Sequence, residues 1–516
     1  MLGRVPATPT HRTVGELMSS PPITATPSEL IAEASDRMRE HRVGSVVVVD
    51  GRRPIGILTE RDLVRFAAAG GDAVGTKVAE WMTEEPDTVA PGVDAADAFS
   101  SLAEHGYRHI PVVEGGEVVG VVSMRDLMRV AQIQPVTHPG AIEAPPGLKG
   151  VVVAETKVGD VRGLEGFYHY REFSAVELAA KRTLEDVWFL LFEGRLPTAA
   201  ERSAFVDEIA EASVLPDAVR RVLPEIAAGS TTVMEGVRTA VSLLGAVRGM
   251  RPTIDIGHEE RRRDAVAVCA AMPVLIMAVH RLMSGQEPID PRPELGYGAS
   301  YLWMLTGSEP DPDVARAVEQ YQMTTIDHGF NASTFTSRVI TSTGADVAAA
   351  VVGGMGALSG PLHGGAPSRA LDLLDAIGSP ERARAYITDR VQAGEVIMGF
   401  GHAVYKTEDP RSNFLRDVAE RIGAEKLPFA GEVERTVVDV LAELKPGRNL
   451  YANVEFYAGV VMDHCGLPRQ LFTPTFASSR VIGWCANILE QAAENRIIRP
   501  SARYVGPPPP QPVPDA

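Results

Sequence analysis

The sequence predicts a multidomain chain in which an N-terminal α+β pair of repeated units precedes a predominantly all-α body. Three observations support this fold class. Segments that begin at Val14 and His41 recur at Val78 and His105, with a constant offset of 64 residues and no gap. A proline-rich stretch follows the second copy, and helical periodicity dominates the chain beyond it.

Each repeat is predicted to hold a helix, a β-branched strand, a tight turn, a second strand and a short helix, in that order. The first copy places apolar residues at helical spacing from Leu30 to Met38, followed by a strand at 46–49. The second copy has Ala98 and Leu102 ahead of a strand at 110–113. Because one copy cannot cover both faces of its small sheet, we expect the two copies to stack against each other.

These patterns also set the expected boundaries. They are an N-terminal tail at 1–11, tandem repeats at 12–134 (12–72 and 76–134), a proline-rich linker at 135–147, the helical body at 148–504 and a proline-rich tail at 505–516. In the body, segments 173–194, 216–229 and 433–444 carry helical periodicity. Ser174 is a candidate N-cap, with Glu177 three residues later.

Composition restricts the partners and the compartment. Lys and Arg number 50 against 67 Asp and Glu, and the net charge of −17 repels phosphate backbones and anionic lipid, so we expect neither nucleic acid nor a membrane as partner. The longest apolar run, Ala265–Val279, is interrupted by Pro273 and is expected to be a buried helix. Three cysteines and no signal-like segment predict a cytoplasmic protein. No metal-ligand cluster is evident in the sequence.

A hydroxyl residue followed three residues later by aspartate recurs at the same place in both repeats. The pairs are Thr59 with Asp62 and Ser123 with Asp126, each where a strand ends and a helix begins. Such an aspartate can accept hydrogen bonds from ribose hydroxyls, while the hydroxyl and the helix N-terminus meet a phosphate. A helix capping box would use the same residues. The recurrence in both copies favours a nucleotide site.

At these residues the repeats resemble a tandem pair of cystathionine-β-synthase (CBS) domains, known as a Bateman module. The resemblance implies a cleft between the repeats that binds an adenosyl ligand such as AMP, ADP, ATP or S-adenosylmethionine. Thr59, Asp62, Ser123 and Asp126 would be its nucleotide-binding residues. The choice among these ligands stays open.

Four segments of the helical body combine histidine, glycine and arginine in an unusual way. They read IDHGFNASTFTSR, GALSGPLHGGAPSRAL, IMGFGHAVYKTEDPR and LYANVEFYAGVVMDHCGLP. Two of their histidines, His363 and His402, lie in glycine-rich loops. Glycine permits unusual backbone angles there and lets a ligand approach the backbone closely.

These segments closely resemble the citrate synthase family, from about Leu148 to Tyr504. The resemblance implies a helical fold with a large and a small domain. It also implies condensation of acetyl-CoA with oxaloacetate and hydrolysis of citryl-CoA to citrate and CoA, a step of the tricarboxylic acid cycle. Neither a metal nor another cofactor would be required. The expected assembly is a homodimer whose subunits share the active site, and a higher oligomer stays open.

The resemblance assigns the catalytic roles residue by residue. His363 matches the donor to the thioester oxygen as the enolate forms. His402 matches the histidine that bonds the ketone oxygen and protonates the new alkoxide, and Glu455 occupies the position of the base. Arg411 and Arg480 match clamps for the two carboxylates, since a guanidinium bonds a carboxylate bidentately. Further matches are His328, Asn331, Ser333 (which would orient His363) and the other subunit's Arg499 for substrate, and Lys406, Lys445 and Arg448 for CoA.

The base is where this chain departs from the family pattern. The family usually has Asn-Val-Asp at this point, whereas this chain has Asn453, Val454 and Glu455. Glutamate is a carboxylate of similar pKa but is one methylene longer. A displacement of ~1 Å can cost ~10²-fold in rate. We expect Glu455 to work as the base because every other site residue is present.

Two other functions stay open at this point. Propionyl-CoA in place of acetyl-CoA would make the chain a 2-methylcitrate synthase, because one methylene is worth only ~1–3 kcal/mol of discrimination. A nucleotide-sensing regulatory protein with an impaired synthase domain is the other, on account of Glu455. The fusion of the two parts suggests that an adenosyl nucleotide regulates the synthase allosterically.

Overall fold

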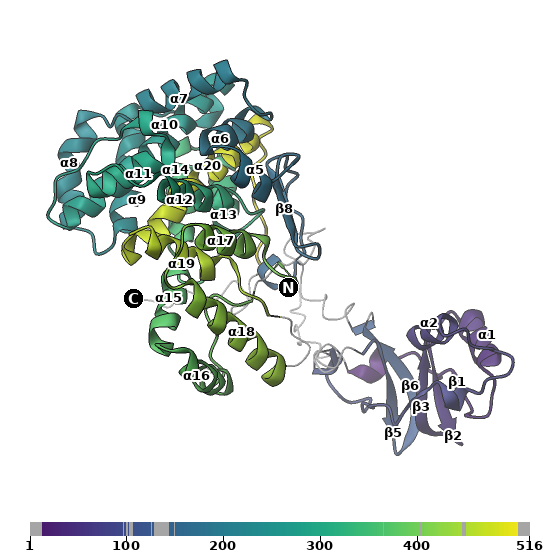
Figure 1. The fold of residues 1–516 in the computed structure, drawn as a ribbon. Helices are drawn as coiled ribbons and strands as arrows, with labels where there is room; N and C mark the ends of the chain where they lie inside the picture. The colour runs from purple at the N-terminus through teal and green to yellow at the C-terminus, as the bar shows by residue number, and fades with distance from the viewer. Residues whose placement is uncertain are drawn as a thin grey trace, which may run out of the picture. The chain divides into compact units, whose positions relative to one another are not determined.

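The structure is a computed structural model that divides into two compact units (Figure 1). One comprises Met1–Lys149 and Pro500–Ala516, and the other comprises Gly150–Arg499. The residues described are 13–95, 97–99, 102, 107–124, 126–127, 144–148, 150–364, 366–401, 404–405, 407–445 and 450–503. The predicted tails at 1–11 and 505–516, and most of the linker at 135–147, lie outside them.

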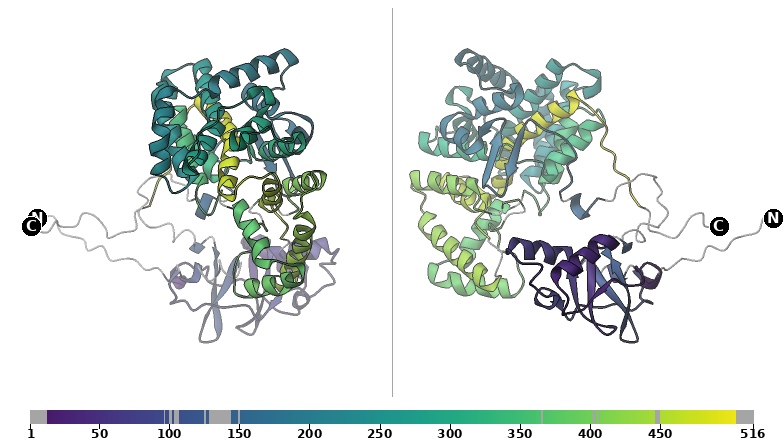
Figure 2. Two further views of the ribbon diagram at one scale, coloured as in Figure 1. Left: turned by 60° about the vertical axis from the view of Figure 1, so that its left-hand side comes forward. Right: turned by 90° about the vertical axis from the view of Figure 1, so that its right-hand side faces the viewer.

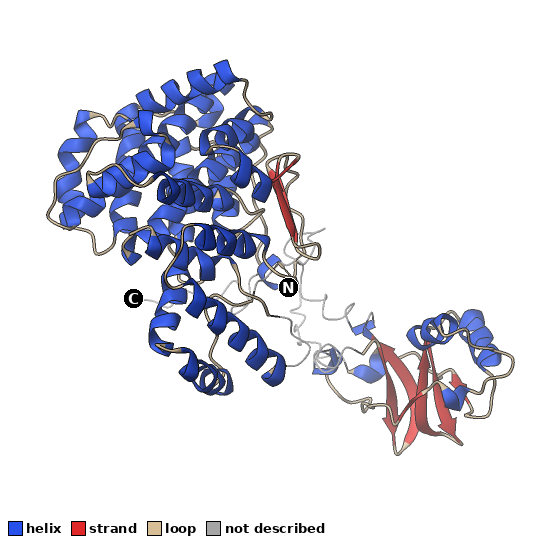
Figure 3. Ribbon diagram, viewed as in Figure 1, coloured by secondary structure: helices blue, strands red, loops and turns tan. Residues whose placement is uncertain are grey.

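The N-terminal unit contains a small sheet for each repeat, with helices beside the strands (Figure 3). The first sheet has the order β1–β2–β3–β4, in which only β1 and β2 are parallel, and the second is the antiparallel pair β5–β6. The predicted strands at 46–49 and 110–113 lie within β2 and β5. The elements are η1 (Val14–Glu16), β1 (Thr24–Ala25), α1 (Ile31–His41), β2 (Ser45–Asp50), β3 (Arg53–Thr59), α2 (Glu60–Ala68), η2 (Val78–Glu80), β4 (Thr83–Glu84), β5 (His109–Glu114) and β6 (Glu117–Ser123).

Each repeat completes the hydrophobic core of the other. Val14, from the first copy, is buried in the core of the second hairpin, and Val78, from the second copy, is buried in the core of the first sheet. Val47, Val49 and Val118 form a third cluster that joins the two sheets. The expected stacking of the copies is therefore present. The exchange of segments adds buried apolar area that neither copy would have alone.

The second unit is predominantly helical, as the sequence predicts (Figure 3). Thr183, Thr198, Thr232, Asp311 and Asp346 are side-chain N-caps of five of its helices, which explains why those helices begin where they do. Its helices are α5 (Ala175–Lys181), α6 (Leu184–Glu193), α7 (Ala199–Ser213), α8 (Asp217–Ala228), α9 (Val233–Arg248), α10 (His258–Met283), α11 (Tyr297–Thr306), α12 (Pro312–Thr325), α13 (Ala332–Ser342), α14 (Val347–Leu358), α15 (Ala366–Ile377), α16 (Pro380–Gln392), α17 (Pro410–Arg421), α18 (Leu427–Leu444), α19 (Val454–His464) and α20 (Phe472–Ala493), with the short turns η4 (Thr253–Asp255), η5 (Pro293–Leu295) and η6 (Arg469–Leu471). The turn η3 (Pro146–Leu148) belongs to the first unit.

The helices α10 and α20 form the centre of this unit (Figure 1). The predicted apolar run is the buried part of α10, where residues 265–280 are all buried and Pro273 is accommodated inside the helix. By length and composition alone α10 could cross a membrane, with a mean hydropathy of 1.9 in its most apolar window. However, 83% of that window is buried inside the unit. A core helix accounts for the pattern.

Two local features add detail to the predominantly helical body that the sequence predicts. A three-stranded antiparallel sheet of β7 (Gly159–Arg162), β8 (Phe167–Tyr170) and β9 (Phe173–Ser174) precedes α5. The segment 173–194 forms two helices rather than one, because the chain is extended at Arg182 and Thr183 starts a new helix by capping the N–H of Asp186. Ser174 accepts from the N–H of Glu177 at 3.4 Å, as expected for an N-cap.

The helices α15, α16 and α18 extend away from α10 and form a second lobe of the unit (Figure 1, Figure 2). Helices α17 and α19 lie between this lobe and α12, and contact α12 directly. The loops that carry the sequence motifs connect elements on both sides of this junction. The arrangement brings the first turns of α13, α17 and α19, together with a turn of α20, toward one site.

Candidate active site

The start of α13 holds a hydrogen-bonded network of Asn331, Ser333 and His363. The N-cap Asn331 accepts at Oδ1 from the N–H of Thr334 at 3.1 Å, and the same Oδ1 lies 2.8 Å from the hydroxyl oxygen of Ser333. The Ser333 Oγ lies 2.8 Å from Nε2 of His363, which is in the loop between α14 and α15. Burial, and secondly the charge of Arg480, lowers the pKa of His363 to about 4. The imidazole is therefore neutral at pH 7.

His328 lies just ahead of α13, among aromatic side chains. Its Nε2 is 3.0 Å from the hydroxyl oxygen of Tyr405, and its ring centroid is 5.5 Å from those of Tyr168 and Tyr405. The guanidinium carbon of Arg411 lies 5.8 Å from the same two tyrosine rings. Two predicted substrate-binding residues from distant parts of the sequence therefore share their neighbours.

Arg411 lies in the first turn of α17 and forms a bidentate pair with Asp409. Nε donates to Oδ1 at 3.0 Å and Nη2 donates to Oδ2 at 2.7 Å, with both residues almost fully buried. Asp409 also caps α17 by accepting from the N–H of Arg411, and it accepts from the N–H of Val454 at 3.1 Å. An internal ion pair is thus part of the role of Arg411, and Nη1 is left outside that pair.

Arg480 on α20 is 2% exposed and has no carboxylate within salt-bridge distance among the residues described. Its Nε donates to the carbonyl of Thr325 at 2.8 Å, and its guanidinium lies 4.5 Å from the ring centroid of Phe476. Burial lowers its pKa, and the charge of buried Asp327 opposes this effect. A buried guanidinium without a paired anion is costly, so an anionic ligand would stabilise it.

Glu455 lies in the first turn of α19, directly after the cap residue Asn453. The Oδ1 of Asn453 accepts from the N–H of Glu455 at 3.1 Å. The half-buried carboxylate makes no hydrogen bond or ion pair with any residue in the described part of the chain. Burial raises its pKa to about 7. Arg411 and Arg480 act against this rise, and Asp409 adds to it. Such a carboxyl group changes protonation close to neutral pH.

The glycine-rich loop that leads to His402 is held against the start of α19. Gly399 and Gly401 have φ of 86° and 82°, which a side chain would strain. Asn453 donates from its backbone to the carbonyl of Gly399 at 2.9 Å and from Nδ2 to the carbonyl of Gly401 at 3.0 Å. The residue that caps Glu455 therefore also anchors the loop of His402.

Arg480 connects these groups electrostatically, because its charge acts on both His363 and Glu455. Arg411 acts on Glu455 as well. The structure thus brings together four of the predicted residues, which are His363, Arg411, Arg480 and Glu455. Asn331 and Ser333 support the first of them directly.

Other predicted residues are placed elsewhere or not described. Lys445 is the half-buried C-cap of α18, and Arg499 is exposed beyond the end of α20. Neither side chain has a hydrogen bond or ion pair with the described part of the chain. His402, Lys406 and Arg448 lie outside the described residues.

In the N-terminal unit, the predicted nucleotide residues adopt a capping arrangement in both repeats. The hydroxyl of Thr59 donates to Asp62 at 2.6 Å, and that of Ser123 donates to Asp126 at 2.5 Å. Each aspartate also accepts from the backbone N–H of its hydroxyl residue, at 3.0 and 3.2 Å. The capping box that the sequence also permits is therefore formed in both repeats. Thr59 and Asp62 also line a cleft of about 420 Å³ formed by residues of both repeats.

Several residues at the site were not predicted from the sequence. They are Tyr405, Asp409, Asn453 and Trp484, whose indole N–H donates to Ser333. A signal existed for Asp409, because aspartate before proline is typical of a helix start, with proline at the first helical position. The spacing of four between Arg480 and Trp484 places both on one face of α20.

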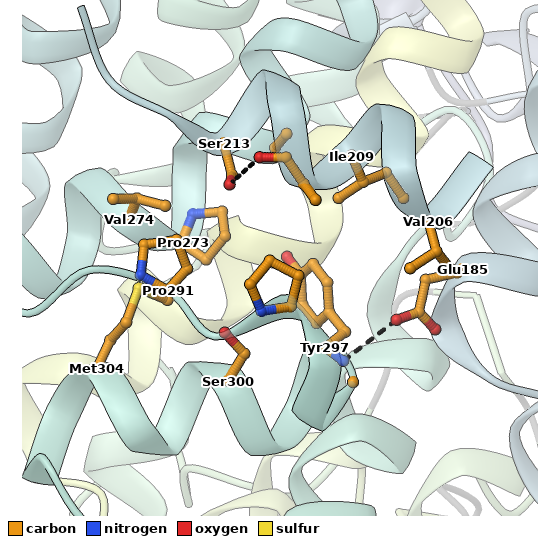
Figure 4. A pocket seen from close by; sticks show the side chains of 14 residues that line it. Glu185, Val206, Ile209, Ser213, Pro273, Val274, Pro291, Tyr297, Ser300 and Met304 are labelled. Atoms are coloured by element: carbon orange, nitrogen blue, oxygen red, sulfur yellow. Dashed lines mark hydrogen bonds between the residues drawn. The ribbon is translucent and has the colours of Figure 1, made fainter. Parts of the chain in front are cut away.

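A separate pocket, between α6, α7, α10 and α11, contains none of the predicted residues (Figure 4). It has a volume of about 50 Å³, enough for one or two water molecules. Its carboxyl group, Glu185, already accepts from the backbone N–H of Tyr297 at 3.1 Å (Figure 4). Within the described ranges no three His, Cys, Asp or Glu side chains form a candidate metal site.

Comparisons with known proteins agree with this arrangement. Residues 147–501 match the model of the citrate synthase C-terminal domain, and residues 14–69 and 78–132 match that of the CBS domain. A citrate synthase of Deinococcus radiodurans is 37% identical over 365 residues, which cover 70% of this chain and 95% of that protein. A putative citrate synthase 2 of Mycobacterium tuberculosis is 38% identical over 369 residues, covering 71% and 94%.

Solved structures give the same result. The citrate synthase of Pyrobaculum aerophilum superposes with a TM-score of 0.66 at 34% identity, covering 73% of this chain and 98% of that one. The citrate synthase of Thermoplasma acidophilum, solved as a ternary complex with carboxymethyl coenzyme A and oxaloacetate, superposes with a TM-score of 0.67 at 27% identity. The match covers 72% of this chain and 98% of that one.

Proposed function

This chain belongs to the citrate synthase family, and on that premise we propose that it condenses acetyl-CoA with oxaloacetate and hydrolyses citryl-CoA to citrate and CoA, under the control of an adenosyl nucleotide bound to its CBS pair. The chain is a citrate synthase-type acyltransferase. One observation carries the finer proposal. The carboxylate of Glu455 makes no hydrogen bond or ion pair in the described part of the chain and lies in the field of two buried arginines, of which Arg480 also acts on His363.

The substrate dicarboxylate would be held by Arg480 and Arg411. Arg480 is buried without a paired carboxylate among the residues described, and a substrate carboxylate would supply the missing anion. Arg411 contributes the part of its guanidinium that Asp409 does not use. His328 adds a ring nitrogen beside Tyr405, and the partner subunit's Arg499 would complete the site.

Proton abstraction is the step assigned to Glu455. Its carboxylate takes a proton from the methyl carbon of acetyl-CoA, and the electron pair of that C–H bond moves to form the enolate. His363, which is neutral at pH 7, donates a hydrogen bond to the thioester oxygen as negative charge develops there. A neutral donor suits an enolate because it stabilises the charge without complete proton transfer.

Carbon–carbon bond formation follows. The enolate carbon attacks the ketone carbon of oxaloacetate, and the ketone oxygen becomes an alkoxide that takes a proton from His402. Water then attacks the thioester carbonyl of citryl-CoA, the C–S bond breaks, and CoA leaves as the thiol. Arg411 and Arg480 keep the two carboxylates in place throughout.

Regulation is proposed from the cleft of the N-terminal unit. The cleft is lined by Thr59 and Asp62 from the first repeat and by Arg108 from the second, so one ligand could touch both copies. Arg61 and Arg108 on its wall form no salt bridge with any residue described and could meet a phosphate. A ligand bound between the repeats changes their packing, and a coupling to the synthase requires unequal affinity for its two states.

The test is steady-state release of free thiol by the full chain with oxaloacetate and either acetyl-CoA or propionyl-CoA, with and without AMP and ATP. We expect a higher kcat/KM with acetyl-CoA and a change in kcat or KM with one nucleotide. A higher kcat/KM with propionyl-CoA would instead identify a 2-methylcitrate synthase. No thiol release with either substrate would refute the enzymatic proposal.

A further inference from the structure

Trp484 is completely buried on α20, one helical turn after Arg480. Its indole N–H donates to the hydroxyl oxygen of Ser333 at 3.1 Å. The ring packs against α14 at Gly354, where a Cβ atom would lie only 3.1 Å from Cδ2 of the indole. The helix packing therefore leaves room for this large side chain and directs its single polar group toward the residue that contacts His363.

The hydroxyl of Ser333 has three polar neighbours, and its single hydrogen limits which of them it can donate to. It offers one donor and two acceptor positions. The indole of Trp484 can only donate, so it occupies one acceptor position. The Oδ1 of Asn331 can only accept, and its orientation is set because it also caps the N–H of Thr334 at 3.1 Å. The third neighbour, Nε2 of His363, lies 2.8 Å away.

Two arrangements of the hydroxyl hydrogen follow. If Ser333 donates to Asn331, Nε2 of His363 must carry a hydrogen and donate to Ser333. If Ser333 donates to Nε2 instead, the hydrogen of the neutral imidazole is on Nδ1, which is then the donor nitrogen. Rotation of one buried hydroxyl therefore sets the tautomer of His363. Trp484 takes up the remaining lone pair and, by donating to Ser333, makes its hydroxyl a stronger donor.

We propose that Trp484 is a positioning residue for the condensation, which acts on His363 through Ser333. It holds the serine oxygen in place and, in the arrangement in which the hydroxyl donates to Nε2 and leaves the imidazole hydrogen on Nδ1, it strengthens that hydrogen bond. The proposal rests on the function proposed above. Trp484 has no part in holding the dicarboxylate, so its loss should slow enolisation without weakening oxaloacetate binding.

The experiment compares Trp484→Phe with Trp188→Phe in the full chain. Trp188 is a matched control, because it is also fully buried in the same unit and its indole N–H has no hydrogen-bond partner among the residues that the structure describes. We expect Trp484→Phe to lower kcat about 3–10-fold, consistent with the loss of one hydrogen bond, with KM for oxaloacetate unchanged. The deuterium isotope effect on kcat with methyl-deuterated acetyl-CoA should increase, and Trp188→Phe should leave it unchanged.

A double-mutant cycle with Ser333→Ala tests the route of the effect. Since Trp484 acts through Ser333, Trp484→Phe should cost nothing further in a Ser333→Ala background. Equal losses of kcat in both backgrounds, or the same behaviour as Trp188→Phe, would refute the positioning role while leaving the enzymatic activity established. If Trp484→Phe does not fold, β-(3-benzothienyl)alanine at position 484 keeps the ring shape without the N–H and serves as the second variant. A wild-type chain without activity would refute the proposed function instead.

Discussion

At the scale of single residues, the protonation of Glu455 depends on how its neighbours are paired. Asp409 accepts from two of the nitrogens of Arg411, so the positive charge of Arg411 is largely compensated. Burial then dominates and raises the pKa of Glu455 to about 7. The sequence predicts that Glu455 takes the place of an aspartate, but it cannot predict this pKa, which depends on the burial of three side chains.

The pH dependence of catalysis follows from this pKa. Only the ionised carboxylate can remove a proton, so kcat/KM should rise with pH through about 7 and level off above it. Glu455→Gln should abolish thiol release while retaining oxaloacetate binding, because the amide has no basic group. Both are measured by thiol release between pH 5 and 9 and by calorimetric titration with oxaloacetate. A rate that is flat from pH 5 to 8 would contradict the assignment of Glu455.

The same pKa predicts a stability effect. The pKa of Glu455 is raised from the usual 4.5 to about 7, so the folded state favours the protonated form. The contribution of the protonated Glu455 side chain to the unfolding free energy is fully present below pH 4.5 and is lost as the pH rises through 7. Glu455→Gln should therefore stabilise the chain by ~1–3 kcal/mol at pH 8 and have little effect near pH 4.5. Thermal unfolding measures this difference, with Glu177→Gln at an exposed ion pair as the control.

At the scale of elements, Asp409 ties two helix starts together. It caps α17, holds the guanidinium of Arg411 and accepts from the backbone of Val454 at the start of α19. A helix N-terminus is stabilised by such an acceptor, and here one carboxylate serves two helices. Asp409 thereby fixes the position of the proposed base Glu455 on α19 relative to the proposed carboxylate clamp Arg411 on α17.

Replacing Asp409 should disturb both stability and catalysis. Asp409→Asn leaves a buried guanidinium without its anion, and we expect a loss of ~3–5 kcal/mol in unfolding free energy. Glu395→Gln, at the exposed pair with Arg390, should cost under ~1 kcal/mol. Because Asp409 raises the pKa of Glu455, its removal should also move the rise of kcat/KM to lower pH. A shift of that rise to higher pH would contradict the arrangement.

Much of the element scale could be predicted from the sequence. Helical periodicity identified the segment that became α8, the longest apolar run became the buried part of α10, and the repeat located the strands of both hairpins. The periodicity did not reveal the break between α5 and α6, where Thr183 caps a second helix inside a continuous apolar pattern. Contacts such as Trp484 with Ser333 join residues 151 positions apart, and no local pattern encodes them.

At the scale of the whole molecule, the question is whether the two units are coupled. Each unit has its own hydrophobic core or cores. The two curated relatives align over 94–95% of their own length with only 70–71% of this chain, so they are little longer than the aligned part. The helical unit is therefore expected to fold and turn over without the repeats. The CBS pair adds nothing to the chemistry of condensation, so its contribution should appear as regulation.

A chain that begins at Leu148 tests this coupling directly. We expect it to retain thiol release but to lose any response to AMP or ATP, whereas the full chain should change kcat or KM by ~5–150-fold if the coupling has the usual 1–3 kcal/mol. Full-length Asp62→Ala is the matched control, since it removes a residue of the cleft and leaves both units present. It should reduce the response at the cost of a helix cap worth ~1 kcal/mol. The same nucleotide response in the truncated chain would place the effector site in the synthase itself, and the CBS cleft would then have another role.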